Sequence, residues 1–354
     1  MLRGNRGEWS EVYTFLTLLS EGKLLTAGQG QPDSEGIGFD VLCIEREETP
    51  GQKIEYHIID DFVSVECSDE IITTEPRDSF REHAGVVYAA ISSADASGPF
   101  SIPDTERFLS EISVRKLKAP SKDKSDISVR VRDPYSGATP LFGWSIKSEL
   151  GSSPTLLNAG KSTNFTFSIS GMTEEDARKL NEISTRSKIK DRVCKCCQNF
   201  GVQFKCVDSY VFSRNMRLID TMFPQIMAKA LLYYYQGEAT TCADVVSLLE
   251  KKDPLGLGAG MYEYKFKKFL VATALGMMPA NPWDGIDDAT GGYIVVGEEG
   301  SLACYNLYNR NTFEDYLLRS TRFETASSTR HEFGKIEKQQ SGYELKLNLQ
   351  IRFN

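Results

Sequence analysis

The stretch from Asp126 to Glu149 places the strongest restriction on the fold of this chain. Residues 127–132 alternate isoleucine or valine with serine or arginine, which is typical of a β-strand. The sequence Asp-Pro-Tyr-Ser-Gly follows at 133–137 and predicts a turn, because proline fixes φ and glycine permits positive φ. Residues 141–149 then predict a second strand, so the segment should fold as a β-hairpin.

The predicted hairpin carries both an acid and a lysine. Successive strand side chains point to opposite faces, so Ser145, Lys147 and Glu149 share one face of the second strand. Asp133 stands where the first strand ends, and we expect it to converge with Lys147 across the strand pair. A carboxylate beside a lysine on paired strands is the framework of a metal-dependent nuclease site.

Composition and charge set wide bounds. The chain has 354 residues, of which 40% are hydrophobic and 25% charged, as in a globular protein of one large domain or two. No run approaches eighteen apolar residues and the first residues lack an apolar signal core, so we expect a cytoplasmic protein without a membrane segment. The net charge of −8 argues against bulk attraction to nucleic acid, although local patches and metal ions can override it.

The first third of the chain predicts a mixed α and β structure. Residues 7–23 show the three- and four-residue spacing of a short amphipathic helix, with Glu8 and Glu11 near its first turn. A favourable interaction with the helix dipole is the ordinary explanation of those two acids. Residues 39–45 and 54–59 predict a hairpin, and residues 62–67 predict another strand.

The middle of the chain offers polar and cysteine-rich candidates. Gly160-Lys161-Ser162 lacks the earlier glycine of a phosphate loop, since Thr155 stands there, so a nucleoside-triphosphate site is excluded. The segment remains a candidate for DNA contact, as does the basic run 186–195, against the alternative of a solvated surface. Cys194, Cys196, Cys197 and Cys206 leave open either a zinc site or reduced thiols. Helical patterns at 215–236, 243–252 and 261–278 predict scaffold.

The last residues return to strand patterning. Residues 343–353 alternate without interruption and give one face of Lys346, Asn348, Gln350 and Arg352. Such side chains donate to phosphates and base edges, although a solvated sheet face explains the alternation equally well. A hydroxyl-rich segment with Arg330 and His331 precedes the strand.

Three separated segments carry a family resemblance. These are the opening Gly7-Glu-Trp-Ser-Glu-Val-Tyr-Thr-Phe, the central Gly143-Trp-Ser-Ile-Lys-Ser-Glu-Leu-Gly151, and the closing Ser327-Ser-Thr-Arg-His-Glu-Phe-Gly334 with Leu347-Asn-Leu-Gln-Ile-Arg-Phe353. Together, in this order and over nearly the whole chain, they resemble the HpaII family of type II restriction endonucleases. The resemblance implies an α+β protein of the PD-(D/E)xK nuclease type, with a central mixed sheet flanked by helices, a helical insertion and C-terminal strands.

The resemblance also implies Mg²⁺-dependent hydrolysis of double-stranded DNA at a short palindrome, with CCGG as the family namesake's site. Asp133 would hold the Mg²⁺ and Lys147 would orient the attacking water. Ser145 departs from the acid expected two residues before the lysine, so the missing charge would come from Glu11 with Glu8 behind it, or from Glu149. The expected DNA-contacting residues are Asn158, Lys161, Asn164, Arg330 and His331, with Lys346, Asn348, Gln350 and Arg352 as second choices.

For the domains, we expect a nuclease core at 1–210 and a DNA-recognition part at 211–354, or one continuous domain. A homodimer and successive nicking by a monomer both remain open, and a cognate DNA methyltransferase is expected in the same system. Two other functions also remain open at this point. One is a catalytically inactive DNA-binding module, and the other is a structure-selective repair nuclease of the same fold.

Overall fold

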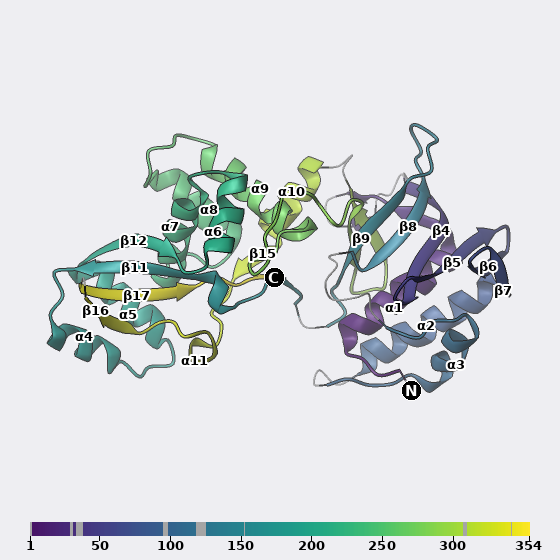
Figure 1. The fold of residues 1–354 in the computed structure, drawn as a ribbon, viewed down its shortest axis with the longest axis horizontal. Coiled ribbons are helices and arrows are strands. Elements are labelled where there is room, and N and C mark those ends of the chain that lie inside the picture. The colour runs from purple at the N-terminus through teal and green to yellow at the C-terminus, as the bar shows by residue number, and fades with distance from the viewer. Residues whose placement is uncertain are drawn as a thin grey trace. The chain divides into compact units, whose positions relative to one another are not determined.

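The computed structural model describes residues 2–28, 31–32, 38–94, 98–117, 125–151, 153–306, 310–340 and 342–354. The chain divides into two compact units, of which the first comprises residues 1–154 and 287–313 and the second residues 155–286 and 314–354 (Figure 1). This division differs from the expected boundary at residue 210, because the strands after residue 291 return to the first sheet.

A mixed sheet of nine described strands dominates the first unit. Its order is β14-β13-β9-β8-β4-β5-β6-β7, with β1 beside β4. Only the β9–β13 pair is parallel among these described pairs. The strands are β1 (Lys23–Leu25), β4 (Gly38–Thr49), β5 (Gln52–Ile59), β6 (Phe62–Cys67), β7 (Glu70–Pro76), β8 (Ile127–Arg132), β9 (Leu141–Ser148), β13 (Gly292–Val296) and β14 (Leu302–Tyr305).

Helices cover one face of this sheet. The helix α1 (Arg6–Glu21) packs against α2 (Arg77–Ser93), and α3 (Pro103–Glu111) adjoins α2. A short pair, β2 (Ala27–Gly28) and β3 (Gln31–Pro32), lies outside the main sheet. Trp144, Ile146 and Val129 point toward the helices and share their hydrophobic core with Trp9. This burial explains the apolar half of the alternation at 127–132.

The other face of the sheet is polar along several strands. The register places Asp126 next to the pair Ile127–Trp144, hence beside Ser145, and pairs Ser145 with Tyr293 of β13. Because paired residues of a sheet point to the same side, Asp126, Ser145 and Tyr293 lie on the face opposite to Trp144 and α1. Polar side chains therefore gather on the face opposite to α1, where Ser145 and Tyr293 are themselves buried.

The second unit combines two small sheets with helices. One sheet has the order β12-β11-β17-β16 and the other β10-β18-β15. Its strands are β10 (Thr155–Leu157), β11 (Asn164–Ser170), β12 (Gly201–Val207), β15 (Thr321–Phe323), β16 (Ile336–Gln339), β17 (Gly342–Asn348) and β18 (Ile351–Phe353). Its helices are η1 (Lys161–Thr163), α4 (Glu174–Asn181), α5 (Lys188–Asn199), α6 (Tyr210–Ile219), α7 (Phe223–Tyr235), α8 (Cys242–Lys252), α9 (Met261–Leu275) and α11 (Ser328–His331), while α10 (Arg310–Arg319) crosses the boundary between the units.

The fold bears out the coarse expectation of a mixed α+β protein with a central mixed sheet flanked by helices. The predicted strand 343–353 is divided, because residues 349–350 leave strand conformation and β18 joins a different sheet from β17. None of the described helices combines the length and the apolar character needed to span a lipid bilayer.

Candidate active site

Asp133 closes the β8–β9 hairpin through its own side chain. Its Oδ1 accepts hydrogen bonds from the backbone N–H groups of Tyr135 and Ser136, both at 2.8 Å. Its backbone also bonds to Ala138 and Gly137, and the residue is only 3% exposed. These contacts are those of an aspartate that stabilises a turn.

The structure does not bring Asp133 and Lys147 together. The backbone N–H of Asp133 donates to the Ala138 carbonyl, so Ala138 stands opposite Asp133. Lys147 lies nine residues after Ala138 in the sequence. At the strand rise of about 3.3 Å per residue, that spacing is roughly 30 Å. The expected convergence of these two side chains is therefore wrong, because Asp133 stands at the closed end of the hairpin and Lys147 beyond its open end.

Asp126 occupies the position that we expected Asp133 to fill. Its Oδ2 accepts hydrogen bonds from Ser145 Oγ at 3.0 Å and from the backbone N–H of Ile146 at 2.7 Å. Lys147 Nζ donates to Ser145 Oγ at 2.9 Å and to the Ile146 carbonyl at 3.2 Å. Aspartate, hydroxyl and ammonium thus form a continuous chain of hydrogen bonds at the start of β8.

Sequence reasoning missed Asp126 although a signal was present. Counting backwards from the Asp133–Gly137 turn in an antiparallel pair places residue 126 opposite residue 145. Applying that register would have selected the aspartate that opens the first strand rather than the one that closes it.

An aromatic cluster lies beside Lys147. Its ammonium lies 5.1 Å from the centroid of the Tyr293 ring, a distance at which the ring attracts a cation. Tyr305 is paired with Tyr293 on the neighbouring strand β14, and Phe313 packs on both rings. Burial raises the pKa of Tyr305 to about 12, and the nearby Glu149 carboxylate adds to that rise.

Glu149 lies at the end of the same strand face. Burial raises its pKa above the ordinary glutamate value, and the Glu298 carboxylate raises it further. Two acids that disfavour each other's ionisation attract a cation. Glu149 therefore stays in the set of candidate metal ligands.

Helix α1 runs beside β9, as expected, but on the other face of the sheet from Lys147. Ser10 Oγ donates to Ser148 Oγ at 2.8 Å, and Ser148 shares its face with Ile146. Glu8 Oε2 accepts a hydrogen bond from the Asn5 backbone N–H at 2.9 Å, and Asn5 Oδ1 accepts one from the Glu8 backbone N–H at 3.0 Å. The two residues form the capping box of α1. Glu8 therefore caps the start of α1, and Glu11 is half-buried on the same helix.

Two of the predicted DNA-contacting residues are buried inside the second unit. Asn164 and Asn348 are 2% and 1% exposed and face each other across β11 and β17. Asn348 Nδ2 donates to Asn164 Oδ1 and to the Gly160 carbonyl, both at 2.7 Å. These two amides hold the loop before β11 in place, so the expectation that they contact DNA is corrected.

Several predicted basic residues already have acidic partners. Lys346 pairs with Asp208, Arg352 with Glu324, and Lys161 with Glu332, at N–O distances of 2.8, 3.2 and 2.6 Å. The acids come from distant parts of the chain, so the acid-free pattern at 345–353 does not describe the folded surface. Asn158 and Arg330 are exposed, and His331 and Gln350 are half-buried.

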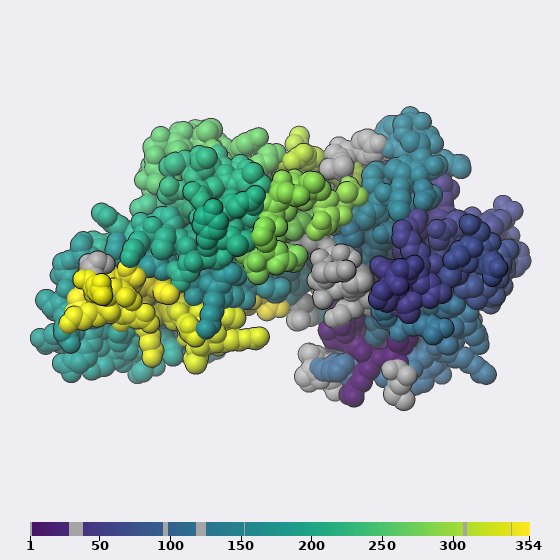
Figure 2. Space-filling model, in the orientation of Figure 1, coloured from purple at the N-terminus to yellow at the C-terminus, as the bar shows by residue number. Residues whose placement is uncertain are grey.

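A cavity of about 730 Å³ in the second unit collects positive charge. It lies between the helices α4 and α5 and the segment 328–346. In Figure 2 the helices are teal and the segment is yellow, and the two surfaces lie side by side. Its basic lining residues outnumber its acidic ones, the former being Arg186, Lys188, Arg192, Lys335 and Lys346 and the latter Glu182, Glu332 and Glu337. The Arg192 guanidinium is held by backbone carbonyls of Leu180 and Asn181, and burial lowers its pKa.

The cysteines at 194–206 do not assemble a zinc site. Cys196 is buried in α5, whereas Cys206 is exposed on β12. Within the part of the chain that the structure describes, no group of three metal-ligating side chains includes any of these four. They are reduced thiols.

Comparison with known proteins gives the class of the chain. The family model of the HpaII restriction endonuclease matches residues 5–353. The type II restriction enzyme HpaII of Haemophilus parainfluenzae is 41% identical over 356 residues, covering 99% of this chain and 98% of that protein. No solved structure matches the chain significantly.

These two matches define the class of the chain as a site-specific endonuclease. The chain belongs to the HpaII restriction endonuclease family and is a type II restriction enzyme. Membership favours this activity over an inactive DNA-binding module or a structure-selective repair nuclease.

Proposed function

We propose that the chain hydrolyses phosphodiester bonds of double-stranded DNA at a short palindrome, with Mg²⁺ held at the open end of the β8–β9 hairpin. The observation that carries this proposal is the hydrogen-bonded chain Asp126–Ser145–Lys147. In this proposal the three residues form a variant PD-(D/E)xK motif in which Ser145 replaces the acid before the lysine. A CCGG-like site is the first sequence to test, given the family.

The donor set at this position fits Mg²⁺. The Asp126 carboxylate, the Ser145 hydroxyl and the Ile146 carbonyl each offer an oxygen ligand. Ser145 Oγ is hydrogen-bonded to Asp126, and Lys147 Nζ is hydrogen-bonded to Ser145 Oγ and to the Ile146 carbonyl. Glu149 follows on the same strand face. Mg²⁺ prefers oxygen ligands and keeps several waters, so a site with few carboxylates suffices once DNA phosphate adds its own charge. When bound, Mg²⁺ polarises the phosphoryl oxygen and lowers the pKa of a coordinated water.

Each side chain of the site has its own role in the proposed reaction. Asp126 supplies the negative charge, and its bond to the Ile146 N–H fixes the carboxylate against the strand. Lys147 lies within hydrogen-bond reach of Ser145 and Ile146, from where its ammonium orients a water and stabilises negative charge developing on the phosphate. Ser145 holds the lysine and the aspartate in register and cannot itself replace the missing carboxylate. Glu149, on the same strand face, is our first candidate for that charge, and Glu11, whose helix lies on the other face of the sheet, is the second.

The second unit would supply DNA contacts. Arg186, Lys188 and Lys335 line the cavity and would contact phosphates, and the exposed Arg330 would be a candidate for guanine. We also propose that cleavage of both strands involves a homodimer, and that a cognate methyltransferase protects the host DNA.

Digestion of unmethylated phage DNA with run-off sequencing of the ends tests the proposal. We expect discrete fragments whose ends fall at one short palindrome, only with Mg²⁺ present, and none with Asp126→Asn. Intact duplex left uncut, or cleavage confined to branched DNA, would overturn it.

A further inference from the structure

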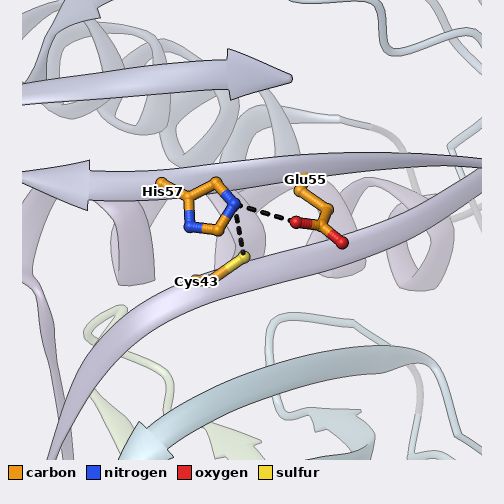
Figure 3. Close-up of side chains that lie close together, drawn as sticks. All are labelled: Cys43, Glu55 and His57. Carbon is orange, nitrogen blue, oxygen red and sulfur yellow. Dashed lines mark hydrogen bonds and ion pairs between the residues drawn. The ribbon is translucent and has the colours of Figure 1, made fainter. Parts of the chain in front are cut away.

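A group of potential metal ligands, separate from the Asp126–Lys147 chain, lies on the polar face of the first unit. Cys43 of β4 stands directly opposite His57 of β5, and Glu55 lies two residues before His57 on the same face (Figure 3). One ligand atom from each of these three residues lies within 4.8 Å of the other two. The side chains converge because the strand register places them side by side.

The distances suit a small cation. His57 Nε2 lies 3.8 Å from Cys43 Sγ and 2.9 Å from Glu55 Oε2. Ligands of a tetrahedral zinc ion, at bond lengths of 2.0 to 2.3 Å, lie roughly 3.3 to 3.7 Å apart. Only small side-chain rotations therefore separate the observed arrangement from a metal-bound one.

A fourth donor is available on the next strand. Glu66 of β6 pairs with Glu55 in the sheet register, and its Oε2 lies 3.9 Å from His57 Nε2. Two carboxylates thus converge on one imidazole nitrogen, and in the described residues neither forms an ion pair with a lysine or an arginine. The neighbouring Glu45 differs, because Lys53 and Arg130 already neutralise it.

We propose that Cys43, Glu55, His57 and Glu66 form a structural Zn²⁺ site that joins β4, β5 and β6. Thiolate and imidazole select zinc over Mg²⁺, which prefers oxygen ligands alone. Binding forms the Zn–S bond as the Cys43 thiol releases its proton to solvent. The Cys43 side chain is buried, whereas the side chains of Glu55 and His57 are 42% and 33% exposed. The ion can therefore enter from the side of Glu55 and His57.

Cobalt is the probe of choice, because Co²⁺ takes zinc sites and a thiolate ligand gives a charge-transfer band in the near ultraviolet. The full-length protein, stripped of metal and free of DNA, is titrated with Co²⁺ and then with Zn²⁺. We expect one equivalent of Co²⁺ to bind with the thiolate band, and Zn²⁺ to displace it. The band should be absent in Cys43→Ser and retained in Cys206→Ser, whose exposed thiol is the matched control.

His57→Gln keeps the proposal testable should Cys43→Ser fold poorly. We expect it to weaken Co²⁺ binding by more than about a hundredfold, since even outer-shell changes weaken metal sites by ten- to a hundredfold. Zn²⁺ should raise the unfolding midpoint of the wild type and of Asp126→Asn but not that of His57→Gln. Absence of the thiolate band in the wild type, or its persistence in Cys43→Ser, would overturn the proposal. Neither result depends on whether the enzyme cleaves DNA.

Discussion

The two ends of the β8–β9 hairpin each carry an aspartate that accepts backbone N–H groups, yet the two have different surroundings. Asp133 Oδ1 accepts from Tyr135 and Ser136 within its own turn. Asp126 Oδ2 accepts from Ile146 of the opposite strand and from the Ser145 hydroxyl, which also holds Lys147. A carboxylate that accepts only from its own turn stabilises the fold, whereas Asp126, linked to Lys147 through Ser145, is our proposed catalytic carboxylate.

The comparison predicts its largest effect for Asp126→Asn. This change keeps the shape and removes the negative charge, so we expect Mg²⁺-dependent cleavage to fall by about a thousandfold, with little loss of stability. Single-turnover cleavage of a plasmid, with thermal unfolding followed by circular dichroism, measures both. Cleavage within tenfold of the wild-type rate would contradict a catalytic role for Asp126.

Lys147→Gln should have the next largest effect. The amide can still reach Ser145 but carries no charge, so we expect cleavage to slow by about a hundredfold while DNA binding changes little. The matched control is Lys53→Gln, an exposed lysine of the same sheet that pairs with Glu45. Equal losses in both variants would assign the effect to net charge rather than to the site.

Asp133→Ala should act on stability instead of cleavage. The backbone N–H groups of Tyr135 and Ser136 lose their acceptor, and the loss of two hydrogen bonds should lower the free energy of unfolding by about 1–3 kcal/mol. Urea denaturation measures the loss, and Asp133→Asn is the control because its amide oxygen can still accept both bonds. Loss of cleavage by a fully folded Asp133→Asn variant would instead assign a catalytic role to Asp133.

The smallest effect is expected for Glu149→Gln. The pKa of Glu149 is raised in the folded state, so its protonated form favours folding and that contribution is lost as pH rises through the raised pKa. At neutral pH the neutral glutamine should therefore raise the unfolding midpoint slightly, and the difference should disappear below the ordinary glutamate pKa. Midpoints measured across this range test the sign, and destabilisation at neutral pH would contradict it.

Local patterns predicted much of the fold, and long-range contacts limited the rest. The α1 helix and the β4–β5 and β8–β9 hairpins follow from residue spacing, turn chemistry and capping. Each residue of the parallel strand β13 lies 148 residues after its partner in β9, and no local signal marks that pairing.

The candidate site was predicted only in part, for the same reason. Lys147 and Ser145 followed from strand alternation, but choosing the aspartate required the strand register. The face of Lys346 and Arg352 looked free of acid in the sequence, whereas Asp208 and Glu324 reach it from other elements. The alternation gave no indication that Asn164 and Asn348 turn inward, because each strand's burial depends on which sheet it joins.

The position of a Mn²⁺ ion in crystals of the enzyme–DNA complex tests the central claim most directly, since manganese accepts the oxygen ligands that suit Mg²⁺ and is located by its anomalous scattering. We predict a peak within about 2.2 Å of an Asp126 carboxylate oxygen, between that residue and the scissile phosphate, with Lys147 beside it. A peak bound by Asp133 at the hairpin turn, with none at Asp126, would contradict the account.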